Sequence, residues 1–317
     1  MEFEINPNPF FMVGTLVTRG TICFETLDRS KVVKYSWVRI LGKSEIDFLQ
    51  HAHGIEGVAE YVTTDVICTM GDYLKELNFS NASFWKMRSS DPFISKAEDA
   101  EESKNPQLRD RELSRIVITP HGHSLRSSKT IMEFLVVIRD AIVAHRRLYV
   151  EKKILHGDIS DGMLIDLDHA EMAGAPQHAN DNFSLTGTMK FMVLERLQYA
   201  SKSKPTINRT FHHDLESFFC VFIVGCITYE RGKKSEEVID LQNWFTGTIK
   251  NNYVAKQLAV LAFEEDILHK FSTKFLSLKP LATELRTILF GEHEPEYEKI
   301  IKAFNNTIEE VRGKINQ

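Results

Sequence analysis

The hydrophobic pattern of this chain changes its period near residue 120, and that change sets the fold class. Residues 11–35 alternate between apolar and polar and are rich in Val, Thr and Phe, which indicates two or three strands. Beyond residue 120, apolar residues recur every three or four positions, which is typical of helices that pack on one face. A β-rich first third and an α-rich remainder predict an α+β protein.

The first third also contains one helical pattern between its strands. From about Trp37 to His53 the apolar residues share a face with Glu45, whereas Asp47 points away. A carboxylate on an inward face needs a partner, because burying an unpaired charge is costly. Further strands are predicted at 58–67 and 114–119.

Two features suggest a boundary between lobes near residue 120. The segment from about 87 to 113 is charged and almost free of apolar residues, which indicates a surface insertion. After the next strand, Pro120 and Gly122 break the pattern. We therefore expect a small β-rich N-lobe at 1–120, which holds the insertion, and a larger helical C-lobe at 121–317.

Composition and apolar runs predict an intracellular protein, either cytoplasmic or nuclear. With 39 Lys and Arg against 44 Asp and Glu, the net charge of −5 argues against a dedicated nucleic-acid binder. The acidic N-terminus lacks a signal-peptide pattern. The sequence contains no C-x-x-C pair, so a zinc ribbon or a thioredoxin-type redox site is not expected. The longest apolar run, Phe218 to Tyr229, is shorter than the ~20 residues of a membrane span and predicts a buried core helix.

The residues that could carry chemistry are concentrated between positions 156 and 168. His156-Gly157-Asp158 is followed by Asp166-Leu167-Asp168, and Asp161 lies between them. Carboxylates in this order suit phosphoryl transfer, which needs one acid near the acceptor hydroxyl and others to hold Mg²⁺ on the phosphates. Taken alone, the same residues could equally be aspartates that cap turns.

Other residues fall in the order of a known signature set. Lys34 ends a strand, Glu45 lies on the inward face of the next helix, and Thr186-Gly187-Thr188, Glu195 and His213-Asp214-Leu215-Glu216-Ser217 follow the acidic loop. In this order they resemble the strand lysine, helix glutamate, HRD, DFG and APE motifs of protein kinases. Lys31 lies only three residues before Lys34, so it is an alternative match to the strand lysine of the kinase motifs.

One branch of the kinases is a closer match. The segments LHGDIS, LIDLDHA, TGT followed by FM and ERL, and HHDLESFFCVF resemble the fungal-type protein kinase domain family, from about Gly14 to Phe290. HDLES and TGT-x-x-FM together make the match specific. The resemblance implies a bilobal protein-kinase-like fold that uses ATP and Mg²⁺.

The resemblance also implies a role for each matched residue. Lys34 would contact the α- and β-phosphates of ATP and pair with Glu45, beside a glycine-rich loop reduced to Gly14 and Gly20. Asp158 would be the catalytic carboxylate that accepts or orients the acceptor hydroxyl, and Asp166 would bind Mg²⁺.

Two further acids would support the site. Glu195 would brace the substrate-facing loop through a buried ion pair, with Arg286 suggested as its partner. Asp214 would hold the catalytic loop, residues 156–168, by bonding its backbone.

The chain departs from the family pattern at two places besides the degraded glycine loop. Gly157 replaces the arginine of HRD, which usually reads a phosphorylated activation loop. No asparagine lies between Asp158 and Ala179, so either Met163 occupies that position or the N-I-L strand and the turn after it are missing. Seven residues between the key aspartates are too few for two strands of about five residues each.

Three functions therefore remain open from the sequence. The first is a protein kinase that phosphorylates Ser or Thr hydroxyls of a protein substrate. The second is a pseudokinase that serves as a binding or scaffold protein, or the product of a shortened gene model. The third, a small-molecule kinase of the aminoglycoside or choline type, fits the HGD form but not TGT-x-x-FM and HDLES. A protein partner is expected, rather than nucleic acid or a membrane.

Overall fold

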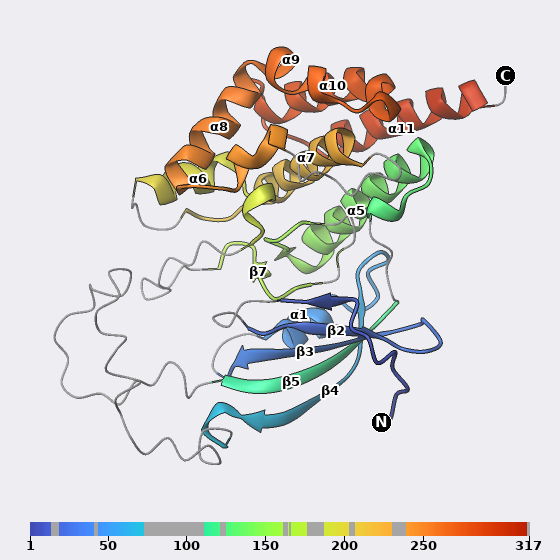
Figure 1. Cartoon of the computed structure of the whole chain (residues 1–317), viewed down its shortest axis with the longest axis vertical. Helices are drawn as coiled ribbons and strands as arrows, with labels where there is room; N and C mark the ends of the chain where they lie inside the picture. The colour runs from blue at the N-terminus through green and yellow to red at the C-terminus, as the bar shows by residue number, and fades with distance from the viewer. Residues whose placement is uncertain are drawn as a thin grey trace. The chain divides into compact units, whose positions relative to one another are not determined.

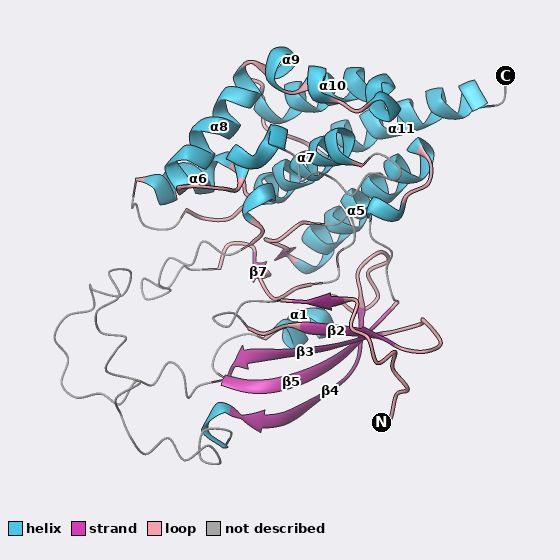
Figure 2. Cartoon of the chain, in the orientation of Figure 1, coloured by secondary structure: helices cyan, strands magenta, loops and turns pink. Residues whose placement is uncertain are grey.

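The structure is a computed structural model, and it divides the chain into two compact units (Figure 1). The first unit is Met1–Asp47 with Glu60–His121, and the second is Phe48–Ala59 with Gly122–Gln317. An antiparallel sheet dominates the first unit and helices dominate the second, so the predicted α+β class is confirmed (Figure 2). The two-lobed arrangement with a boundary at residue 120 stays a prediction. The described residues are 1–13, 19–40, 44–72, 111–120, 125–160, 164, 166–175, 187–202, 207–229 and 239–315.

A five-stranded antiparallel sheet of order β1-β2-β3-β5-β4 forms the first unit. Its strands are β1 (Phe11–Met12), β2 (Ile22–Glu25), β3 (Val32–Arg39), β4 (Glu60–Thr69) and β5 (Arg111–Thr119). The central strands β3 and β5 pair over their whole shared length, from Val32 opposite Ile118 to Arg39 opposite Arg111. Strand β3 lies between β2 and β5, and four of its side chains are buried: Val32, Val33, Lys34 and Ser36.

Two expectations about this unit were wrong at their boundaries. The predicted helix from Trp37 begins only at Glu45, where α1 (Glu45–His51) starts, and Trp37 lies in β3 opposite Leu113. Pairing with β5 extends β3 to Arg39, so long-range ladder bonds override the local helical spacing. The same pairing places Arg111 to Leu113 in β5 rather than in the charged insertion, whose other residues, and Gly14, lie outside the described residues.

The second unit is built mainly from helices. Its α-helices are α5 (Ile131–Lys152), α6 (Leu194–Ser201), α7 (Phe211–Thr228), α8 (Ile249–Leu261), α9 (Phe263–Asp266), α10 (Lys279–Phe290) and α11 (Tyr297–Ile315). Short 3₁₀ helices are η2 (Leu125–Ser127), η3 (Met189–Phe191), η4 (Ile239–Trp244), η5 (Leu268–Lys270) and η6 (Thr273–Leu278). A two-stranded antiparallel sheet joins β6 (Ile154–Leu155) to β7 (Glu171–Met172).

Helix α7 forms the centre of the second unit. By length and hydropathy it could cross a membrane, but 67% of its 18 residues are buried inside the structure, as in a core helix. Its Phe222 ring lies 6.0 Å from that of Phe134 on α5, which in turn lies 4.9 Å from Phe275. Because α7 is buried on nearly all sides, its sequence is apolar without helical periodicity. The same packing holds the polar first turn of α7 against α5.

Because α5 and α7 are in close contact at Gly225, replacing this helical glycine by alanine should destabilise the protein instead of stabilising it. A Cβ there would lie 2.6 Å from two ring atoms of Phe134, which is fully buried. Alanine favours a helix by about 1 kcal/mol over glycine, but overpacking a core costs about 1–3 kcal/mol. The overpacking cost offsets or exceeds the helix gain, so we expect Gly225→Ala to lower the free energy of unfolding in urea by up to about 2 kcal/mol.

Gly313 on α11 is the matched control, because nothing lies within 4 Å of its added Cβ. Gly313→Ala should raise the free energy of unfolding by up to about 1 kcal/mol. Stabilisation by both substitutions would contradict the packing described for Gly225.

Candidate active site

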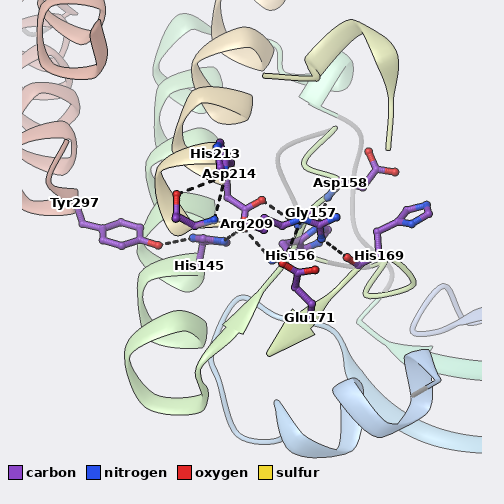
Figure 3. Close-up of polar contacts among 11 residues, drawn as sticks. His145, His156, Gly157, Asp158, His169, Glu171, Arg209, His213, Asp214 and Tyr297 are labelled. Atoms are coloured by element: carbon purple, nitrogen blue, oxygen red, sulfur yellow. Dashed lines mark hydrogen bonds and ion pairs between the residues drawn. The ribbon is translucent and has the colours of Figure 1, made fainter. Parts of the chain in front are cut away.

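The loop from His156 to Asp158 is held by one buried carboxylate. Asp214, in the first turn of α7, is 2% exposed and accepts hydrogen bonds from the backbone N–H groups of His156 and Gly157, each at 2.9 Å (Figure 3). The contact expected between Asp214 and the loop backbone is therefore present. Two bonds to adjacent amides fix both the position and the direction of the chain just before Asp158.

Asp214 stays ionised because neighbours compensate for its burial. Burial opposes the charge, but His145 offsets this by its charge and its hydrogen bond, and the pKa of Asp214 is held well below its usual range. His145 Nε2 lies 2.8 Å from Asp214 Oδ2, and its Nδ1 lies 2.7 Å from the hydroxyl oxygen of Tyr297. An ionised carboxylate only accepts, so Nε2 donates to Asp214, and Nδ1 shares the second hydrogen bond with the Tyr297 hydroxyl.

This Tyr297–His145–Asp214 chain connects three helices. Tyr297 opens α11, His145 lies on α5 and Asp214 begins α7. All three side chains are buried, and a fully satisfied polar chain in a core specifies one arrangement of the helices around it. The loop before Asp158 thus takes its position from the packing of the whole helical unit.

Asp158 itself is half-buried at the edge of a pocket. Its Oδ1 accepts from the backbone N–H of Thr188 at 2.8 Å, and its own N–H donates to His156 Nδ1 at 3.3 Å. Burial lowers the pKa of His156 to about 4, so this ring is neutral near pH 7 and can accept that bond. Arg196 and Arg209 line the same pocket as Asp158 and Thr188.

Asp166 and Asp168 lie together in the turn before β7. The N–H of Asp168 donates to Asp166 Oδ1 at 3.1 Å, and an oxygen from each carboxylate lies within 4.8 Å of the other. Carboxylate oxygens are the ligands that Mg²⁺ prefers in proteins, so the donor atoms fit this ion. Asp161 lies outside the described residues, as does Met163.

The connection between the two acidic segments is as short as the sequence indicates. β6 pairs directly with β7, Ile154 opposite Met172 and Leu155 opposite Glu171. Among the described residues between these strands, none forms a further strand, and Leu164 makes only an isolated bridge with Val58. Residues 161–163 and 165 lie outside the described residues, so the loss of the strand pair stays a prediction.

The first unit contains the expected lysine and glutamate as a pair. Lys34 Nζ on β3 lies 2.8 Å from Glu45 Oε2 at the start of α1, with the two side chains 6% and 1% exposed. Lys31 instead bonds the Ser30 hydroxyl at 2.8 Å, at a turn. Each buried charge requires the other, since losing one partner of such a pair costs about 3–5 kcal/mol. Gly20 has a φ of 57°, a conformation that suits glycine.

The expected buried ion pair of Glu195 with Arg286 was wrong. The Glu195 side chain is 54% exposed and pairs with His213 at 2.8 Å, whereas Arg286 donates to the Val260 carbonyl at 2.8 Å. Glu195 points outward because it starts α6, where a carboxylate at the helix N-terminus does not need to be buried to be favourable.

Lys256 on α8, rather than a Glu195–Arg286 ion pair, braces the segment before α6. Its fully buried ammonium donates to the carbonyls of Met189, Lys190 and Met192 at 3.3, 2.9 and 2.7 Å, and burial lowers its pKa. Glu216 on α7 accepts from the Leu194 N–H at 2.7 Å, and burial raises the pKa of this carboxyl to about 7.

Sequence reasoning missed several residues that organise this site. His145 is spaced with the apolar residues of α5 that are buried, and a histidine at that spacing is the signal that could have found it. Lys256 interrupts an apolar helix in the same way. Tyr297 and Arg209 carried no signal, because their contacts depend on segments far away in the sequence.

Comparison with known proteins decides the family. The family model described as fungal protein kinase matches residues 1–226 of the 317. The chain belongs to the fungal protein kinase family. The resemblance found in the sequence is thereby confirmed, and membership supports a kinase-type phosphotransferase. No curated protein matches the chain. The match to the fungal protein kinase model ends within α7, so Lys256 and Tyr297 lie beyond it.

The bonds of Lys256 predict a large effect of its removal. In Lys256→Met the three carbonyls lose their donor, and each hydrogen bond to a charged group contributes about 1.5–3 kcal/mol. We expect the free energy of unfolding in urea to fall by about 3–5 kcal/mol, less than the sum of the three bonds, because the substitution also removes the cost of burying a charge. The control is Lys250→Met, at an exposed position of the same helix, with a change within about 0.5 kcal/mol. Equal effects of the two substitutions would rule out a bracing role.

Proposed function

We propose that the chain is an active protein kinase that transfers the γ-phosphate of ATP to Ser or Thr hydroxyls of a protein substrate. The observation that supports this most is the environment of Asp158. Its loop is fixed by Asp214, its Oδ1 is held by Thr188, and among the described residues no hydrogen bond engages its Oδ2. One oxygen thus positions the carboxylate and leaves the other for a substrate.

The chemistry proposed for Asp158 follows from this geometry. Phosphoryl transfer needs little covalent help, and a carboxylate that accepts the proton of the attacking hydroxyl also orients it in line with the phosphate. Thr188, which binds Asp158 Oδ1, lines the same pocket. We propose that this pocket receives the acceptor residue of a protein substrate.

Asp166 and Asp168 are proposed to hold Mg²⁺. The ion, when bound, supplies positive charge that makes the phosphates of ATP tolerable beside several carboxylates. The two aspartates offer oxygen ligands within one turn, and the bond from the Asp168 N–H fixes the Asp166 side chain. Lys34 is proposed to bind phosphate oxygens, with Glu45 holding its ammonium in place.

A pseudokinase is the second candidate, and one observation favours it. Among the described residues between β6 and β7, none forms a further strand. Without the asparagine of the family pattern, one Mg²⁺ ligand is lost. Such a chain could bind a nucleotide or a partner protein and transfer no phosphate.

Autophosphorylation separates the two candidates. We expect wild-type protein to bind Mg-ATP and to incorporate labelled phosphate from the γ position. Asp158→Asn should keep ATP binding, because asparagine retains the oxygen that bonds Thr188, and should lower transfer by at least about 100-fold, the range of acid–base catalysis.

Asp140→Asn is the control, since Asp140 is an exposed acid on α5 whose side chain bonds Arg139. Its transfer rate should match the wild type. If the wild type and both variants bind ATP but transfer no phosphate, the result would support the pseudokinase and contradict the proposed enzyme.

A further inference from the structure

Position 157 has no room for a side chain, and the cause is an arginine from elsewhere in the chain. Gly157 has a φ of 78°, and a Cβ added there would overlap Nη1 of Arg209 and lie 2.6 Å from its Cζ. The carbonyl oxygen of His169 would be 2.7 Å away. The guanidinium of Arg209 therefore fills the space beside the loop that a larger residue at 157 would need (Figure 3).

Arg209 uses that place to connect separate segments. It precedes α7, and its Nη1 donates to the His169 carbonyl at 2.5 Å. Its Nε lies 3.7 Å from Glu171 Oε1 on β7, and the Arg209 side chain is 11% exposed. One guanidinium thus touches the backbone of the 156–158 loop and binds the turn that follows Asp166 and Asp168.

We propose that Arg209 replaces, in space, the arginine that the sequence lacks at position 157, and that it holds the Asp158 loop and the Asp166–Asp168 turn in a fixed relation. Arg209 is a positioning residue, because it acts through the backbone of residues 157 and 169. An effect of Arg209 on phosphate transfer rests on the proposed kinase function. The contacts of Arg209 with residues 157, 169 and 171 do not depend on that function.

The partners of Arg209 imply that it can join the Asp158 loop to the Asp166–Asp168 turn without a phosphorylated residue. An HRD arginine would be expected to read a phosphorylated activation loop through charge-assisted bonds. Here a backbone carbonyl and the carboxylate of Glu171 supply the negative partners from within the chain. A planar guanidinium suits both at once, because its N–H groups point in several directions and it stays charged at all relevant pH values.

The nearby charges support a cation at this place. Arg196 lines the same pocket, and burial together with the charge of Arg209 lowers its pKa to about 10. Glu171, Asp214 and Asp158 act in the opposite direction on Arg196, so acids of the same region offset part of the repulsion between the two cations.

Hydrogen exchange of the full-length protein tests the connection without requiring activity. In Arg209→Ala, amides of both 156–158 and 168–171 should exchange at least about tenfold faster, because local opening costs less free energy. Exchange within α8 should be unchanged. Arg209→Lys serves if the alanine variant does not fold, since lysine lacks the fork. Arg147→Ala, which removes a more exposed arginine bonded to Glu56, is the control.

A double-mutant cycle tests the shared space directly. Gly157→Ala should increase exchange in the wild-type background more than in the Arg209→Ala background, by about fivefold or more, because the overlap with the guanidinium is gone. Strain from the positive φ is common to both backgrounds and cancels. Equal increases would overturn the inference, as would unchanged exchange in Arg209→Ala.

Activity and phosphatase treatment complete the test. If wild-type protein transfers phosphate, Arg209→Ala should lower kcat by about tenfold with KM for ATP within about twofold. Phosphatase treatment of the wild type should leave exchange at both segments unchanged, and faster exchange would overturn the phosphate-free contact. Absence of transfer with the expected exchange pattern would count against the proposed function and leave the Arg209 inference standing.

Discussion

The buried carboxylate of Asp214 is the interaction on which the rest of the site depends. It faces the backbone amides of His156 and Gly157 on one side and His145 on the other. A buried charge is stable only when its neighbours satisfy it, so the loop, α5 and α7 must keep one arrangement. Tyr297 extends this requirement to α11, beyond the residues that the fungal protein kinase model matches.

The site also shows how the chain compensates for lost family residues. Gly157 leaves out an arginine, and Arg209 fills the vacated space with the same chemical group. Glu195 is exposed, and Lys256 braces the segment before α6 instead. In each case the side chain that supports the site comes from a different place in the sequence. No such replacement is found among the described residues for the missing asparagine and its strand pair.

Much of the fold followed from local patterns, and the rest depended on distant contacts. The core helix α7 follows from its unbroken apolar run, and the inward position of Glu45 follows from apolar spacing, because burial selects the residue types there. The end of β3 at Arg39 did not follow, because β5 stabilises it from a segment more than seventy residues away. For the site, motif order gave Asp158, Asp166 and Asp214, whereas Arg209 and Lys256 act through space and belong to no motif.

Exchange of the His156 and Gly157 amides tests the central role of Asp214 most directly. In Asp214→Asn the carboxylate is replaced by a group with one acceptor oxygen and an NH₂ donor, which cannot accept both N–H groups as before. We expect at least one of the two amides to exchange about tenfold faster or more, while amides of β3 in the first unit keep their wild-type rates. Wild-type protection of both amides in a folded Asp214→Asn protein would contradict this account.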